Sequence, residues 1–182
     1  MSTLQQYQAV AQECRNLFEK KTRDYGSSWR VLRTISVVDQ LFIKALRIRN
    51  LQSIAEQKVA DDIRSEFVGI FNYALIGLIQ WEKKQPAIEE LDLPAALAAF
   101  DAAKQLAQQT MEEKNHDYGE AWRDMSQESF ADLILVKLLR IKQILGNDGQ
   151  TLVSEGIEAN YTDIANYAAF ALILIAEGKH KA

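Results

Sequence analysis

Two nine-residue stretches of the chain carry the same chemically capable side chains. The first runs from Lys21 to Trp29 as KTRDYGSSW, and the second runs from Lys114 to Trp122 as KNHDYGEAW. A lysine ammonium binds phosphate as a point charge, and an aromatic ring can stack on a nucleotide base. Both stretches are therefore candidate loops over a ligand, with the lysines on phosphate and the other side chains near the base: Asp24, Tyr25, Trp29, Asp117, Tyr118 and Trp122. The alternative is a structural helix connection in which the tyrosine and tryptophan rings seal the end of a bundle.

A pair of cations follows each stretch. Lys44 and Arg47 lie one helical turn apart, and Lys137 and Arg140 repeat that spacing. A lysine supplies a point charge and an arginine a planar fork, and both suit phosphate oxygens. We therefore predict phosphate binding on this helical arc, which carries one acid in each copy, Asp39 and Asp132. The alternative is a solvated face with an intrahelical ion pair, worth under about 1 kcal/mol.

One carboxylate stands near the head of the last apolar stretch in each copy. Copy two has Asn160 and Asp163 where copy one has Glu66 and Gly69. A buried, unpaired carboxylate costs several kcal/mol, so Asp163 needs a cation, a hydrogen-bonding partner or a metal ion. Facing carboxylates on bundle helices can hold divalent metals, and an all-oxygen set favours magnesium or manganese. We therefore predict a magnesium site at Asp163, Glu66 and Glu158. A polar face on the same stretches carries Asn72, Tyr73, Asn166 and Tyr167.

The two copies belong to one long internal repeat. Residues 4–50 placed over residues 97–143, an offset of 93, give 16 identical residues in 47 pairs. Many of the identical residues are polar, and core packing alone does not explain why a polar residue is kept twice. The offset becomes 94 in the last apolar stretch, so one residue is gained before it.

Apolar residues recur at helical spacing, and β-rich runs bounded by turns are missing. The pattern predicts three helices in each copy, at about 4–21, 36–51 and 57–83, and at about 96–114, 129–145 and 155–178. The last helix of each copy is apolar nearly all round, which indicates a central position. We expect an all-α, six-helix bundle made of two tandem three-helix repeats related by a pseudo-twofold axis. It would form a single compact domain over 1–182, with repeat 1 at about 4–83, a linker at about 84–94 around the only two prolines, and repeat 2 at about 95–178.

Composition excludes several functional classes. The net charge is −4, without the basic surface that nucleic-acid binding requires, so no direct nucleic-acid binding is expected. The single cysteine fits a reducing compartment, and no apolar run is long enough for a membrane span, so we expect a cytoplasmic protein. The two histidines and one cysteine lack zinc-ligand spacing, and no glycine-rich phosphate loop is present. A monomer and a homodimer both remain open.

The repeated residues resemble the nucleotide modification associated domain 1 family. Copy two matches its motif through Lys114-Asn115, Asp117-Tyr118-Gly119, Ala121-Trp122, Lys137, Arg140-Ile141-Lys142, Glu155 and Asp163-Ile164-Ala165-Asn166-Tyr167-Ala168, and copy one matches in part but has Gly69 for the late aspartate. The helical organisation is also similar to the all-α nucleoside triphosphate pyrophosphatases of the MazG and dimeric dUTPase types. Those enzymes bind magnesium through Glu-x-x-Glu and Glu-x-x-Asp pairs, and each copy here holds half of such a pair.

The resemblance implies a link to nucleotide metabolism or modification. We predict a nucleotide-binding protein that acts as a magnesium-dependent nucleoside triphosphate pyrophosphohydrolase, with a nucleotide or another phosphorylated small molecule as its partner. The two copies would form one competent and one degenerate site, or a single composite site. The alternatives are a non-catalytic helical binding module, and repeated polar residues that only specify the bundle. A functional site requires Asp163, Lys137 and Tyr118 to line one concavity.

Overall fold

All regular structure in the described residues, 1–84 and 86–182, is helical in the computed structural model. Six α-helices and two short 3₁₀ segments follow one another in the same order in both halves of the chain. Their bounds are α1 Thr3–Tyr25, η1 Ser28–Val31, α2 Thr34–Ser53, α3 Ile63–Glu82, α4 Leu93–Tyr118, η2 Ala121–Asp124, α5 Gln127–Gly146 and α6 Ile157–Ala176. The predicted all-α bundle of two tandem three-helix repeats is therefore confirmed.

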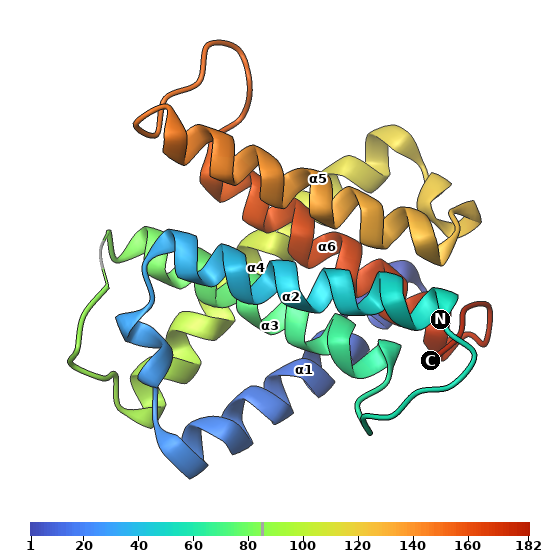
Figure 1. The fold of residues 1–182 in the computed structure, drawn as a ribbon, viewed down its shortest axis with the longest axis horizontal. Coiled ribbons are helices and arrows are strands. Elements are labelled where there is room, and N and C mark those ends of the chain that lie inside the picture. The colour runs from blue at the N-terminus through green and yellow to red at the C-terminus, as the bar shows by residue number, and fades with distance from the viewer. Residues whose placement is uncertain (85) are drawn as a thin grey trace.

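The helices form three layers of two (Figure 1). The apolar helices α3 and α6 pack on each other along their length in the centre, as their sequences predict. The pair α2 and α5 covers one side of this centre, and α1 and α4 cover the other. The centre is tight because a Cβ atom at Gly77 of α3 would lie 2.6 Å from the ring of Tyr161 on α6. The end of α3 therefore crosses the start of α6, so the two helices run antiparallel.

Several element boundaries differ from the prediction. The first helix of each repeat continues through the Asp-Tyr pair and ends at Tyr25 or Tyr118, where Gly26 (φ 71°) and Gly119 (φ 63°) supply the left-handed backbone that stops it. The third helix of repeat 1 begins at Ile63 rather than near residue 57, because Asp62 caps it by accepting a hydrogen bond from the backbone N–H of Ser65. The predicted linker, 84–94, includes Gln85, which lies outside the described residues.

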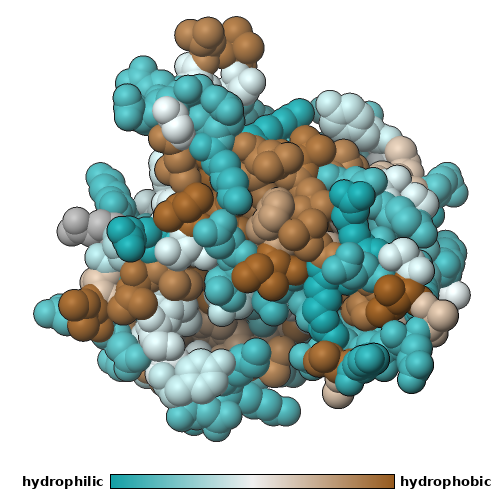
Figure 2. Space-filling model, viewed as in Figure 1, coloured by the Kyte–Doolittle hydropathy of each residue, from teal (hydrophilic) through white to brown (hydrophobic). Residues whose placement is uncertain are grey.

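The outer face of the α2 and α5 layer carries an apolar strip (Figure 2). It consists of exposed residues at equivalent positions of the two repeats, namely Ile43, Leu46, Val136 and Leu139. Among the residues that the structure describes, no helix combines the length and the apolar character that crossing a membrane requires.

Candidate functional site

Each repeat builds a pocket of its own from the same three parts. The walls come from the Lys-x-x-Asp-Tyr-Gly-x-x-Trp stretch, from the lysine of the second helix, and from the Asn-Tyr pair of the third helix. The first pocket encloses about 390 Å³ and includes Lys21, Tyr25, Trp29, Lys44, Gly69, Asn72 and Tyr73. The second encloses about 450 Å³ and includes Lys114, Tyr118, Trp122, Lys137, Asp163, Asn166 and Tyr167. Asp163, Lys137 and Tyr118 therefore share one concavity, and neither pocket is composite, since each is lined by residues of a single repeat.

A buried carboxylate joins two lysines in the second pocket. Lys114 Nζ donates to Asp163 Oδ1 at 2.6 Å, and Lys137 Nζ donates to Asp163 Oδ2 at 2.7 Å. The Asp163 side chain is 8% exposed, so this pairing removes the cost of a buried charge. Partial burial alone would lower the pKa of Lys114, but the hydrogen bond and charge of Asp163 raise it above its ordinary value, so this lysine stays protonated.

The first pocket holds the same two lysines without that carboxylate. Its α3 position is Gly69, and a Cβ atom there would lie only 2.9–3.0 Å from the end of the Lys44 side chain. Lys44 Nζ instead lies 3.6 Å from Glu66 Oε2, and Arg47 also pairs with that carboxylate. Lys21 forms no ion pair or hydrogen bond with another described residue. The lysines of the first pocket are therefore less neutralised than those of the second.

The aromatic residues divide between core and rim. Trp29 and Trp122 are buried, and each also lines its pocket, so they are core residues with one edge toward the cavity. The Trp122 ring stacks on Phe170 with centroids 4.3 Å apart. Tyr25 and Tyr118 are exposed at the rim, 58% and 78% respectively. Burial raises the pKa of Tyr73 and Tyr167, deeper in the pockets, above the ordinary phenol value.

The asparagines tie the third helices to the first ones. Asn72 Nδ2 donates to the carbonyl of Cys14 at 3.0 Å, and Asn166 Nδ2 donates to the carbonyl of Ala107 at 3.0 Å. These two bonds occupy equivalent positions in the repeats, so the asparagines orient the first helix of each pocket. They are structural supports as well as lining residues.

Four predicted acids lie outside both pockets. Asp24 and Asp117 are exposed in the last turn of the first helices. Asp39 Oδ1 lies 3.3 Å from Lys142 Nζ, and Asp132 Oδ1 lies 3.7 Å from an Arg49 nitrogen. These two exposed pairs join α2 and α5 symmetrically, which explains why the acids occur in both copies without a role in a site.

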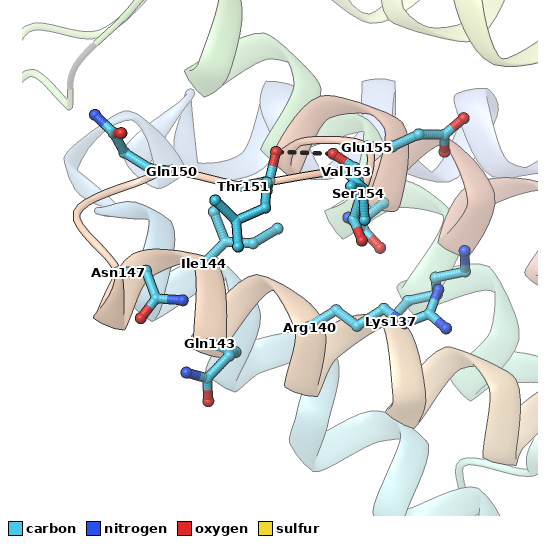
Figure 3. A pocket seen from close by; sticks show the side chains of 12 residues that line it. Lys137, Arg140, Gln143, Ile144, Asn147, Gln150, Thr151, Val153, Ser154 and Glu155 are labelled. Atoms are coloured by element: carbon cyan, nitrogen blue, oxygen red, sulfur yellow. Dashed lines mark hydrogen bonds between the residues drawn. The ribbon is translucent and has the colours of Figure 1, made fainter.

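The arginines of the second helices also lie apart from the two pockets. Arg47 pairs with Glu66 and donates to the carbonyl of Asp61 at 2.7 Å. Arg140 lines a separate cavity of about 620 Å³ beneath the α5–α6 loop, together with Lys137. Figure 3 shows both cations on the α5 side of this cavity, with Glu155 across from them. Lys137 is thus shared by two cavities, whereas Lys114 belongs to one.

The carboxylates predicted to hold magnesium do not come together. The described residues contain no group of three or more histidine, cysteine, aspartate or glutamate side chains placed to hold a metal ion. In the antiparallel α3–α6 pair, Asp163 lies about nine residues along the helix from Glu66, or about 14 Å at 1.5 Å per residue. Both carboxylates are already bound by cations, and Glu158 is exposed. This arrangement does not fit a magnesium site, and magnesium binding stays a prediction from the sequence.

Sequence reasoning gave no role to Arg30 and Arg123, although they are identical in the two copies. Arg30 is buried and donates to Gln80, whose Nε2 donates to the carbonyls of Arg30 and Leu32 at 2.8 and 2.9 Å. Arg123 lies over the Trp122 ring, 4.4 Å from its centroid. Both arginines fix the 3₁₀ segments that place the tryptophans, and their repetition was the signal that could have found them.

Comparison with known proteins identifies both repeats. The family model described as nucleotide modification associated domain 1 matches residues 21–81 and again residues 114–175. The two matches cover well over half of the chain and confirm the resemblance inferred from the motifs. No curated protein and no solved structure matches the chain significantly, so the similarity to all-α pyrophosphatases finds no support there.

Proposed function

Because the chain belongs to the nucleotide modification associated domain 1 family, we propose that it binds a nucleotide or a related phosphorylated small molecule in the lysine-lined pockets. The family name points only to an association with nucleotide modification. The binding proposal rests on the chemistry of the pockets.

The observation that carries the proposal is the convergence of two lysines on one anionic group. In the second pocket, two ammonium groups from different helices each bind one oxygen of a single carboxylate, at 2.6 and 2.7 Å. A phosphate group offers the same kind of oxygens with more charge, and charge-assisted hydrogen bonds of this type are among the stronger ones in proteins. Aromatic rings beside the lysines provide a surface for a base.

The size and lining of the pockets agree with a small ligand. Ligand pockets usually measure about 300–1,000 Å³, are mostly apolar, and contain a few polar groups that orient the ligand. Cavities of about 390 and 450 Å³ fall within this range. Tyr25 or Tyr118 at the rim would lie at the entrance, and the less exposed Lys44 and Lys137 lie deeper, next to the third helix.

A more specific possibility is that the protein hydrolyses a nucleoside triphosphate. The pockets support hydrolysis less well than binding. Phosphoryl chemistry in such enzymes relies on metal ions that neutralise developing charge. The pocket carboxylate Asp163 is held by two lysines rather than left free for a metal ion. We therefore favour the non-catalytic binding module, which was the alternative from the sequence.

Thermal stabilisation by ligands tests the proposal directly. A ligand present at 100 times its Kd stabilises the folded state by about 2.7 kcal/mol, which raises the melting temperature measurably. Nucleoside mono-, di- and triphosphates would be screened with and without magnesium, and released pyrophosphate would be measured in the same samples. Binding without product supports the module, product formation supports the hydrolase, and no stabilisation by any nucleotide contradicts both.

Charge-neutral variants identify the residues responsible. Lys21→Gln and Lys44→Gln remove one pocket ammonium each and keep most of the side-chain length. Lys20→Gln is the matched control, because Lys20 is exposed and lies outside the pocket lining. Equal loss of binding in all three variants would show a diffuse charge effect instead of a site.

A further inference from the structure

The two pockets differ most at one position of the third helix. Asp163 places a carboxylate between Lys114 and Lys137 in the second pocket, whereas Gly69 occupies the equivalent position in the first. Among the described residues that line the first pocket, none is acidic. Lys21, Lys44 and Gly69 also line an adjoining cavity of about 520 Å³, whose acids are Glu13, Asp61 and Glu66. The second pocket, by contrast, is lined by Glu155 as well as by Asp163.

The positive charge of the first pocket is correspondingly less compensated. Lys44 Nζ lies 3.6 Å from Glu66 Oε2, at the long end of an ion pair, and that carboxylate also serves Arg47. Lys21, from the last turns of α1, has no acidic partner among the described residues. Two like charges facing one cavity repel each other, and an entering anion relieves that repulsion.

Gly69 also lets Lys44 lie close to the third helix. A Cβ atom at this position would lie 2.9 Å from Lys44 Cε and 3.0 Å from Lys44 Nζ. The ammonium of Lys44 therefore lies directly over the helix backbone, where an aspartate stem would otherwise begin. The absence of a side chain at Gly69 therefore gives room to the Lys44 side chain itself, which in this repeat lies against α3 without a carboxylate between the two lysines.

We propose that the first-repeat pocket is the anion receptor of this protein. In the second repeat, the carboxylate of Asp163 occupies the position that the bound anion takes in the first. The proposal rests on the proposed function and names its ligand class, a nucleoside monophosphate or a phosphate monoester of similar size. The phosphate binds Lys21 and Lys44, and the base lies against Tyr25, Trp29 and Tyr73. Two lysine ammonium groups match the charge of one phosphate group, which favours a single phosphate over a triphosphate chain.

Moving the acid between the repeats tests the proposal. AMP and dTMP are the nucleotide probes, inorganic phosphate tests the anion alone, and adenosine tests the base without phosphate. Titration calorimetry should give about one site in the wild-type protein and about two in Asp163→Gly. Gly69→Asp should weaken binding by about tenfold or more, because the new carboxylate takes the lysines that bind phosphate. The double variant Gly69→Asp/Asp163→Gly should bind about one ligand again, in the other repeat.

Tryptophan indole N–H resonances report which pocket is filled. Trp29 lines the first pocket, Trp122 lines the second, and Trp81 lies elsewhere, beside Thr34 and Lys84. In ¹H–¹⁵N spectra the Trp29 resonance should move on titration of the wild-type protein, and the Trp122 resonance should move in the double variant. Movement of Trp122 alone in the wild-type protein, or wild-type affinity in Gly69→Asp, would overturn the proposal.

Control variants separate a lost site from a lost fold. Circular dichroism checks each variant, and Lys21→Gln/Lys44→Gln removes the receptor charge without adding volume, so it must also lose the site. Asp163→Ala replaces Asp163→Gly if glycine weakens α6, and it must also yield a second site. If inorganic phosphate binds the wild-type protein but not Gly69→Asp, and no nucleotide binds the wild-type protein, the nucleotide function is refuted and the anion receptor is supported. Nucleotide binding that is unaffected by Gly69→Asp would keep the function and refute the assignment to the first repeat.

Discussion

Exchange of a tyrosine and a phenylalanine between the two repeats should change stability in opposite directions. Tyr7 on α1 is fully buried, and its hydroxyl donates to Asn166 Oδ1 at 2.8 Å across the boundary between the repeats. Phe100 on α4 occupies the equivalent position, and Asn72 Oδ1 has no hydrogen-bond partner among the described residues. One repeat thus has a satisfied buried amide, and the other has the same amide with an unused acceptor.

The expected magnitude follows from burial. Tyr7→Phe leaves Asn166 Oδ1 unpaired in the core, and an unsatisfied buried polar group costs about 1–3 kcal/mol. For a chain of this size, 1 kcal/mol shifts the melting temperature by about 2–4 °C, so the loss should be about 2–12 °C. Phe100→Tyr supplies the missing hydroxyl to Asn72 Oδ1 and should stabilise by about 0.5–1.5 kcal/mol, the net worth of one hydrogen bond.

Urea unfolding followed by circular dichroism measures both changes, with the slope of the transition checked for constancy. The double variant Tyr7→Phe/Phe100→Tyr should show nearly additive effects, since the two hydroxyls bond different asparagines. An unchanged unfolding midpoint in Tyr7→Phe would contradict the predicted cost of the unpaired amide. Destabilisation by more than about 1 kcal/mol in Phe100→Tyr would also contradict the prediction, because the added hydroxyl would then be buried without a partner.

Two further predictions concern the packing and the charge of the bundle. Gly77→Ala should destabilise by about 1–3 kcal/mol in urea unfolding, because its Cβ would lie 2.6 Å from the Tyr161 ring; the control Gly146→Ala, with nothing within 4 Å of its Cβ, should be neutral or slightly stabilising. The hydrogen bond from Arg15 lowers the pKa of Asp101 below its ordinary value of 3.8. Its contribution to stability is therefore fully present above about pH 3.8 and is lost as the pH falls through the lowered value. Asp101→Asn should reduce the loss of unfolding free energy at acid pH, measured by urea unfolding at several pH values. The same pH dependence in the variant and the wild-type protein would contradict this prediction.

The fold follows from the sequence because its strongest signals are redundant. The repeat appears in polar and apolar residues alike, and α3 and α6 are apolar on nearly every face, so their central position needs no further information. The helix boundaries were less predictable. The motif glycines stop α1 and α4 only after the Asp-Tyr pair. The first 3₁₀ segment, η1, depends on the buried contact of Arg30 with Gln80, which is distant in sequence.

The candidate site was predictable in its parts but not in its pairings. Lys21, Lys44 and Trp29 were recognised because they recur, and they do line one pocket. Helical periodicity placed Asp39 and Lys44 on the same face of one helix, yet Asp39 pairs with Lys142 on the neighbouring helix. Which cation neutralises which acid depends on side-chain packing between helices, and one-dimensional spacing does not contain that information.

The complementary acids of the repeats explain why the two halves can diverge without losing stability. Each repeat sets two lysines and one arginine around the one buried acid of its third helix, Glu66 or Asp163. In the first, Glu66 pairs with Arg47 and, at 3.6 Å, with Lys44, and leaves Lys21 without an acidic partner among the described residues. In the second, Asp163 pairs with both lysines and leaves Arg140 without an acidic partner among the described residues. A buried acid is acceptable in either place because a cation is always within reach. The position of the acid therefore selects which cation remains for a ligand, and the repeats keep one scaffold while offering different charges to their cavities.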